Sequence, residues 1–234
     1  MTVMTTPAHE QSELLSLAVH ELRTPVTVVA GYTKMLVKEQ LGPLSERQLK
    51  VLADIEQQCG RLSKLLRELS DLAELVNPES PAPVATDIPV ASLLDDATFG
   101  IESGETGSPV CRSGPADRLT VEGDRKRLPA ALGAVIRAVV REQGGTARVA
   151  VDVASRQHNG RSFAAIAVGR EGSLASAHTG APGVRFNEYP GGIGLGLPIA
   201  RRVIEQSGGQ VWSSEHDRRL GVVTVLLPLK ESRS

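Results

Sequence analysis

A seven-residue repeat of apolar side chains between residues 52 and 76 constrains the fold of this chain more than any other feature. Seven residues are close to two turns of an α-helix, so positions seven apart fall on the same helix face. The repeat therefore predicts a long amphipathic helix that packs against a second helix. Two such rows lie side by side: Leu52, Cys59, Leu66 and Ala73, and Ile55, Leu62, Leu69 and Val76.

Residues 8–76 are predicted to form a helical hairpin. Gly42 and Pro43 end the first helix, and Ser45 is suited to cap the start of the second. The first helix has its own heptad row of Leu15, Leu22, Val29 and Leu36. The combined apolar stripe is wider than a two-helix hairpin can cover. We therefore expect a homodimer whose four helices form a bundle, while packing of the stripe on the second half of the chain is the alternative.

Residues 77–89 contain four prolines among small polar residues and are predicted to be a linker. Beyond it, residues 90–230 change from helical to alternating periodicity. Strand-like runs are TARVAVDVA (146–154), RSFAAIAVG (161–169) and GVVTVLLPL (221–229), and helix-like runs cover about 124–143 and 195–207. The fold class is therefore α+β, with a helical hairpin followed by a mixed α/β domain.

Composition excludes several classes of partner. The formal net charge is −1, and the only aromatic residues are three Phe, two Tyr and one Trp, so no nucleic-acid surface is expected. No apolar run approaches the ~18 residues of a membrane span, and no signal-peptide pattern opens the chain. We expect a cytoplasmic protein without membrane insertion. Cys59 and Cys111 have no metal-ligand spacing, so no metal site of Cys and His is expected.

The sequence AVHELRTPV, residues 18–26, contains the candidate nucleophile. His20 lies roughly 140° to 200° from the heptad row of its helix and is predicted to face solvent. An imidazole in water is mostly neutral at pH 7, so one ring nitrogen is a free nucleophile and Glu21 can hold the proton of the other. Thr24 shares the face of His20 one turn on. Pro25 cannot donate to the carbonyl of Glu21 and is predicted to bend the helix there.

These residues lie within SLAVHELRTPVTVVAGYTKML (16–36), which resembles the H-box of sensor histidine kinases. The resemblance covers residues 9–76. It implies that His20 is phosphorylated, that Glu21 orients and deprotonates it, and that Thr24 positions a water for removing the phosphoryl group from a receiver. It also implies a dimeric bundle and a response-regulator receiver domain as partner.

A second stretch, GGIGLGLPIARRVIEQSGGQVW (191–212), places glycines before a predicted helix. Backbone amides of Gly192, Gly194, Gly196 and Leu197 at a helix start can cradle phosphates. A Rossmann turn and a merely structural tight turn are the alternatives. The stretch resembles the G2 box of the histidine-kinase ATP-binding domain, and FNEY (186–189) loosely resembles the aromatic box before it. The resemblance implies an α/β sandwich of the histidine-kinase ATPase type, with ATP and magnesium as cofactors.

Two other boxes of that domain depart from the family. GDRKRLPAALGAVIRAVVRE (123–142) resembles the N-box, but Ala134 and Ala138 stand where the family has asparagine, and a methyl group offers magnesium no oxygen. In IAVGREGSLA (166–175), Gly172 is retained, but Arg170 stands where a carboxylate should accept the adenine amino group. That mismatch costs about 1–3 kcal/mol.

Three functions therefore stay open. The first is an autokinase that passes phosphoryl groups from ATP through His20 to a receiver aspartate. The second is an ATP-independent dimeric histidine phosphotransferase. The third is a non-catalytic partner of true kinases, against which the intact HELRTP sequence argues.

Overall fold

The computed structural model describes residues 7–77, 84–102, 110–143, 148–158, 160–174, 184–185, 195–214 and 221–230 of the 234-residue chain. The chain divides into two compact units, Met1–Pro81 and Ala82–Ser234. The boundary falls within the segment 77–89.

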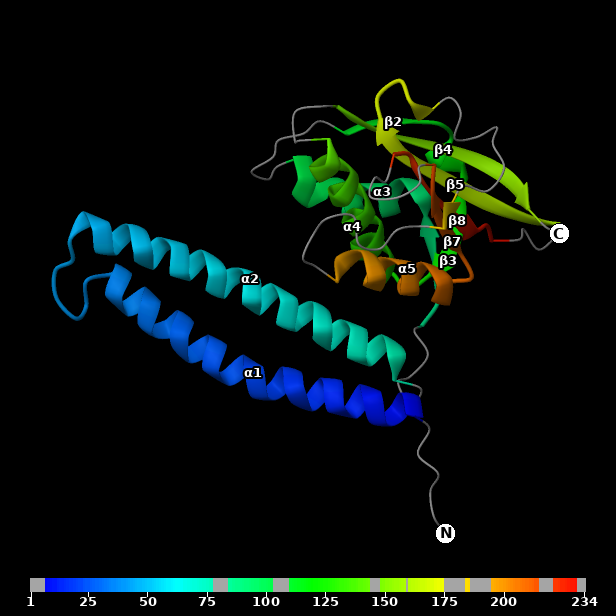
Figure 1. The fold of residues 1–234 in the computed structure, drawn as a ribbon. Coiled ribbons are helices and arrows are strands. Elements are labelled where there is room, and N and C mark those ends of the chain that lie inside the picture. The colour runs from blue at the N-terminus through cyan, green and yellow to red at the C-terminus, as the bar shows by residue number, and fades with distance from the viewer. Residues whose placement is uncertain are drawn as a thin grey trace, which may run out of the picture. The chain divides into compact units, whose positions relative to one another are not determined.

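The first unit is an antiparallel hairpin of α1 (Pro7–Val37) and α2 (Glu46–Val76), which lie side by side along their length (Figure 1). A capping box starts α2: the Ser45 hydroxyl accepts a hydrogen bond from the Gln48 amide at 3.4 Å, and Gln48 Oε1 accepts one from the Ser45 amide at 2.8 Å. Gly42 has a φ of 121°, which favours glycine. The predicted hairpin and its turn are confirmed.

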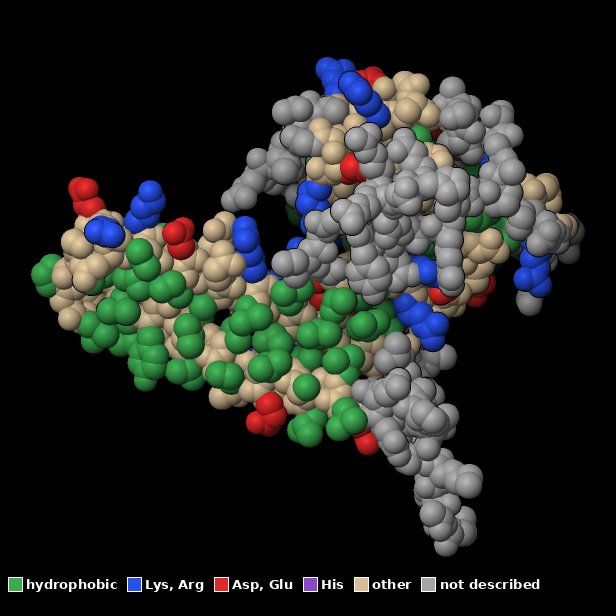
Figure 2. Space-filling model, in the orientation of Figure 1, with side chains coloured by type: hydrophobic (Ala, Val, Ile, Leu, Met, Phe, Trp, Pro, Cys, Tyr) green, Lys and Arg blue, Asp and Glu red, His purple; other side chains and the backbone are tan. Residues whose placement is uncertain are grey.

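The apolar rows of the hairpin divide between its inside and its outside. On α2, Cys59, Leu66 and Ala73 are buried, whereas Leu62 of the other row is 46% exposed. On α1, two members of the heptad row, Leu22 and Val29, are 52% and 49% exposed within the single hairpin. Among the side chains of α1 that the structure describes, the buried ones are Val19 and Thr33. One helix covers only one side of its neighbour, so much of the stripe stays uncovered within a single hairpin, as Figure 2 shows.

The second unit contains a six-stranded sheet in the order β2-β4-β5-β8-β7-β6. Among the described strands of this sheet, β2 and β4 pair in parallel and the other pairings are antiparallel. The strands are β2 (Val110–Ser113), β4 (Val149–His158), β5 (Arg161–Arg170), β8 (Val223–Pro228), β7 (Gln210–Ser213) and β6 (Val184–Arg185). A separate two-stranded sheet pairs β1 (Thr86–Pro89) with β3 (Thr120–Gly123). Residues 86–89 of the predicted linker thus belong to the sheet unit, where Ile88 is buried.

Three α-helices lie together on one side of the six-stranded sheet (Figure 1): α3 (Val90–Glu102), α4 (Arg127–Glu142) and α5 (Gly196–Gln206). The 3-10 helix η1 (Ala116–Arg118) precedes β3. The core of this unit contains β5, which is buried from Phe163 to Gly169, and the continuous apolar face of α4. The long strands and the helices at 127–142 and 196–206 confirm the predicted elements. A hairpin followed by an α/β sheet region confirms the predicted fold class.

No helix in the described part of the chain is long and apolar enough to cross a membrane.

Candidate functional site

His20 lies on α1 with its side chain 76% exposed, so the prediction that it faces solvent is confirmed. Its Nδ1 is 3.5 Å from Oε1 of Glu21, whose side chain is 73% exposed. A carboxylate beside Nδ1 favours the tautomer that carries the proton on that nitrogen. The lone pair is then on Nε2, which is the nitrogen available to an incoming group.

The helix ladder is weakened directly after His20. Pro25 lies inside α1 and has no N–H to donate to the carbonyl of Glu21. The helix continues through this position and curves along its length (Figure 1). One turn on, the Thr27 hydroxyl donates a hydrogen bond to the Arg23 carbonyl at 2.8 Å. Thr24 is exposed on the same stretch, and its role stays a prediction.

A cross-helix hydrogen bond that sequence reasoning missed lies close to His20. Nη2 of Arg23 on α1 donates to the Ser70 hydroxyl on α2 over 3.0 Å. Neither residue belongs to an apolar row, and their pairing depends on the register that the turn imposes. No periodic signal in the sequence reveals such a contact.

The N-terminus of α5 contains two of the predicted phosphate-binding residues. Gly196 is the first residue of α5, and Leu197 is buried at 5% exposure. The Leu197 side chain is therefore part of the core, and only its backbone amide is suited to contact a ligand. Gly192, Gly194 and the FNEY segment lie outside the described residues.

The face of α4 offers magnesium no ligand at the two predicted positions. Ala138 is 4% exposed and packs as a core methyl group, and Ala134 is half-buried. Asp124 Oδ1 accepts from the amides of Lys126 and Arg127 at 2.8 and 3.0 Å, so this carboxylate caps α4. Within the described ranges no group of three or more His, Cys, Asp or Glu side chains is arranged to hold a metal ion. These residues do not fit a magnesium-bound nucleotide.

Arg170 ends β5 with its side chain exposed. The turn that follows is ordered by hydrogen bonds from the Ser173 amide and hydroxyl to the Arg170 carbonyl, at 3.0 and 2.7 Å. Gly172 sits in this turn with a φ of 89°, which favours glycine. The turn is therefore retained, while a guanidinium, which only donates hydrogen bonds, replaces the acceptor that the resemblance implies.

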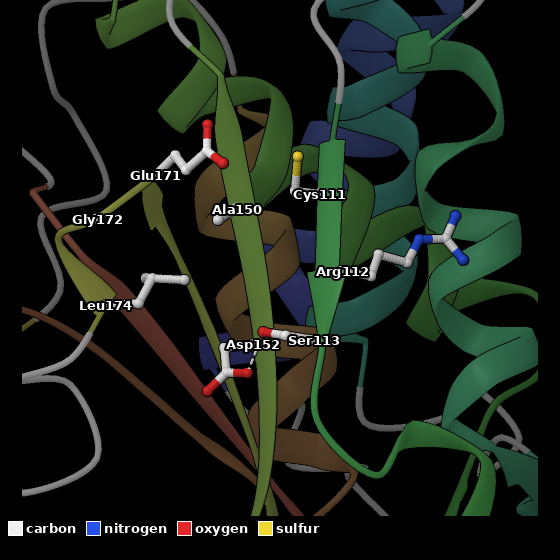
Figure 3. Close-up of a pocket in the computed structure, with 8 residues that line it drawn as sticks. All are labelled: Cys111, Arg112, Ser113, Ala150, Asp152, Glu171, Gly172 and Leu174. Atoms are coloured by element: carbon white, nitrogen blue, oxygen red, sulfur yellow. Dashed lines mark hydrogen bonds between the residues drawn. The ribbon is translucent and has the colours of Figure 1, made fainter.

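A cavity of about 410 Å³ lies beside β2, β4 and this turn (Figure 3). The Ser113 hydroxyl donates to the Asp152 carboxylate inside it. Arg112 points away from the cavity and binds Asp95 and Thr98 on α3. The lining residues are Cys111, Arg112, Ser113, Ala150, Asp152, Glu171, Gly172 and Leu174. Cys111 is a free thiol, and the two carboxylates already have partners, because Asp152 accepts from Ser113 and Glu171 lies 4.0 Å from Arg148.

Comparisons with known proteins show what this chain is similar to. Residues 10–78 match the family described as His Kinase A (phospho-acceptor) domain. The chain is 30% identical over 220 residues to Sensor protein GacS of Pseudomonas syringae pv. syringae, which covers 86% of this chain and 23% of that protein. It is 42% identical over 81 residues to Phosphate regulon sensor protein PhoR of Pseudomonas aeruginosa, which covers 33% of this chain and 18% of that protein.

Among solved structures, full-length ShkA in complex with AMPPNP superimposes with a TM-score of 0.62 at 21% identity, over 95% of this chain and 47% of that one. The chain thus spans about a quarter of the length of GacS and about half of ShkA. The resemblance to sensor histidine kinases that the H-box indicated is confirmed.

Proposed function

We propose that this chain, which resembles sensor histidine kinases over most of its length, accepts a phosphoryl group on His20 and passes it to an aspartate of a response-regulator receiver domain. The observation that carries the proposal is the exposed imidazole whose Nδ1 lies 3.5 Å from the Glu21 carboxylate. A nucleophile with an adjacent orienting base is the arrangement that nucleophilic transfer requires. The match of residues 10–78 to a phospho-acceptor domain supports it.

The chemistry at His20 needs only groups of the hairpin. As Nε2 attacks phosphorus, the bond to the donor breaks and an N–P bond forms, while Glu21 stabilises the proton on Nδ1. On transfer to a receiver, an aspartate oxygen attacks the same phosphorus, the N–P bond breaks and the electron pair returns to Nε2. When the protein instead dephosphorylates the receiver, Thr24 positions a water for hydrolysis of the receiver's acyl phosphate.

Two copies of the chain form the working unit in this proposal. The hairpin exposes large apolar side chains along both helices, which a second hairpin would cover. They are Leu14, Leu17, Leu22, Val28, Val29, Tyr32 and Met35 on α1, and Val51, Ile55 and Leu62 on α2. The homodimer then buries both the row on α1 and the outer row on α2 in one four-helix bundle.

The source of the phosphoryl group divides the proposal. A nucleotide would meet the amides of Gly192, Gly194, Gly196 and Leu197, and the solved relative ShkA, crystallised with AMPPNP, supports such a site. The buried methyl group of Ala138 favours a second candidate, in which no magnesium nucleotide is used. In that candidate a phosphorylated receiver supplies the group, and the dimer relays it to another receiver.

One labelling experiment tests the function and separates the donors. The full chain is incubated either with γ-labelled ATP and Mg²⁺ or with a labelled phosphoreceiver, and His20→Ala is the matched control. We expect an acid-labile label that is absent in His20→Ala, and a rate roughly a hundredfold lower in Glu21→Gln. Label from the receiver alone selects the relay, and label from ATP selects the autokinase. Absence of label by both routes contradicts phosphotransfer and leaves the non-catalytic partner.

A further inference from the structure

Arg23 connects the two helices of the hairpin at a position close to His20. Its Nη2 donates to Ser70 Oγ over 3.0 Å, from α1 to α2. Arg23 follows His20 by three residues, and residues at that spacing have Cβ atoms about 5–6 Å apart on a helix. The long side chain of arginine therefore reaches either the Ser70 hydroxyl or a group attached to the imidazole.

These two partners differ greatly as acceptors. The serine hydroxyl is neutral and uses one donor of a guanidinium that has five. A phosphoryl group on Nε2 carries negative charge on three oxygens and can accept two parallel bonds from arginine, which are roughly twice as strong as neutral ones. Arg23 is exposed, so exchanging one partner for the other requires no burial of charge.

We propose that Arg23 changes partners when His20 is phosphorylated: it leaves the Ser70 hydroxyl and binds the phosphoryl oxygens. The hydrogen bond between α1 and α2 is then present in the unphosphorylated protein and broken in the phosphorylated one. The inference rests on the proposed function, since it requires His20 to carry a phosphoryl group. It assigns Arg23 as a residue that holds the group and Ser70 as its competitor.

The local backbone suits such an exchange. The Thr27 hydroxyl donates to the Arg23 carbonyl at 2.8 Å and holds the backbone of Arg23 in place. Pro25 leaves the carbonyl of Glu21 without its helical donor, one turn back. The guanidinium can therefore move while the position of its Cα is maintained.

The test loads His20 without nucleotide or receiver. Phosphoramidate reacts with the full chain: its N–P bond breaks, a new N–P bond forms on the imidazole, and ammonia leaves with the imidazole proton. The ³¹P NMR signal that is absent in His20→Ala is then followed against pH. Its midpoint reports the second ionisation of the phosphoryl group, which a bound guanidinium lowers.

The titration midpoints of three variants distinguish the proposed exchange from a purely structural hydrogen bond between the helices. We expect Arg23→Gln to raise the midpoint by about 0.3–0.5 pH unit, a two- to threefold change in proton affinity. Arg23→Lys should keep part of the lowering of the midpoint, because lysine retains the positive charge. Ser70→Ala removes the competitor but keeps the guanidinium, so its midpoint should equal or fall below that of the unchanged protein.

A purely structural bond between the helices predicts that Arg23→Gln and Ser70→Ala behave alike, and that result overturns the proposal. An unchanged midpoint in Arg23→Gln, or no His20-dependent signal, overturns it as well. The charged residues near Arg23 and Ser70 in the sequence are the same in all the variants: Glu21 on α1, and Arg67, Asp71 and Glu74 on α2. If the titration behaves as expected but no receiver is phosphorylated, the exchange stands and the proposed function falls.

Discussion

The hairpin and the sheet unit differ in where they place their apolar side chains. In the sheet unit, β5 is buried from Phe163 to Gly169, and the helices cover one side of the sheet. In the hairpin, Leu14 and Leu17 are 67% and 59% exposed, within a band of apolar side chains on its surface (Figure 2). The sheet unit therefore buries its own core, whereas the hairpin leaves large apolar side chains uncovered.

The two units also differ in the groups that chemistry needs. The hairpin keeps an exposed histidine with a carboxylate beside it. The sheet unit has methyl groups at Ala134 and Ala138 and a guanidinium at Arg170, where the resemblance implies oxygen ligands and an acceptor. Its fold is nevertheless complete, because Ala138 packs well as a core residue. Residues that hold a fold together and residues that bind a ligand can thus change independently, even on one helix.

The largest effect on stability should follow from a substitution that creates a new cavity in the core of the sheet unit. Ile166→Ala removes a fully buried side chain from β5 and should lower the free energy of unfolding by about 2–5 kcal/mol. Trp212 is the only tryptophan and packs against the core cluster of Phe163, Ala165 and Leu226. Its fluorescence in urea therefore reports this unit alone.

The control for that change is Val84→Ala, which removes a side chain that is 80% exposed and should leave the transition unchanged. Circular dichroism of the hairpin helices should not respond to Ile166→Ala. A joint shift of both signals would show that the two units unfold as one, and the contrast between them would fail.

A smaller effect should come from the exposed face of the hairpin. Leu62→Ser should weaken the proposed dimer at least tenfold, because burial of a leucine is worth about 1.5–3 kcal/mol. Sedimentation equilibrium measures this, with the unchanged protein near twice 24.8 kDa. Leu41→Ser, which removes a leucine that is 64% exposed in the turn between the helices, is the matched control. A monomeric unchanged protein would contradict the dimer.

The smallest effect should come from replacing glycine by alanine, which should raise the stability of the hairpin and lower that of the sheet unit. Gly60 lies inside α2, and a Cβ added there would meet nothing within 4 Å, so Gly60→Ala should stabilise the hairpin by about 0.5–1 kcal/mol. In the sheet unit, a Cβ on Gly209 would lie 2.4 Å from the Leu226 carbonyl oxygen. Gly209→Ala should therefore lower stability, as urea unfolding followed by Trp212 fluorescence would show. Equal signs for the two glycines would contradict this difference in packing.

Periodicity predicted the hairpin but not which of its faces is inside. Leu22 and Val29 are apolar and periodic, yet they lie on the uncovered face. Thr33 is buried because its hydroxyl donates to the Val29 carbonyl at 2.8 Å, which satisfies the polar group within its own helix. A pattern of apolar repeats does not distinguish the helix face that packs on α2 from a face that packs on another chain. It also does not predict burial of a threonine whose hydroxyl is hydrogen-bonded within its own helix.

In the sheet unit the long elements were predictable and the short ones were not. The runs that became β4, β5 and β8 alternate or are continuously apolar over six residues or more. By contrast β1, β2 and β3 have four residues each, which is too short for a pattern to stand out. For the candidate site, the chemistry of the residue types predicted His20 and Glu21, whereas the contact between Arg23 and Ser70 depends on the register across the hairpin.

The edges of the six-stranded sheet limit how copies of this protein can associate. Within the residues that the structure describes, one edge is β2, with four residues, and the other is β6, with two. Arg112 anchors β2 to Asp95 and Thr98 on α3. Short edges offer an approaching strand few backbone partners, which disfavours growth of sheets from chain to chain. Concentrated solutions should therefore assemble through reversible helix contacts rather than form fibrils.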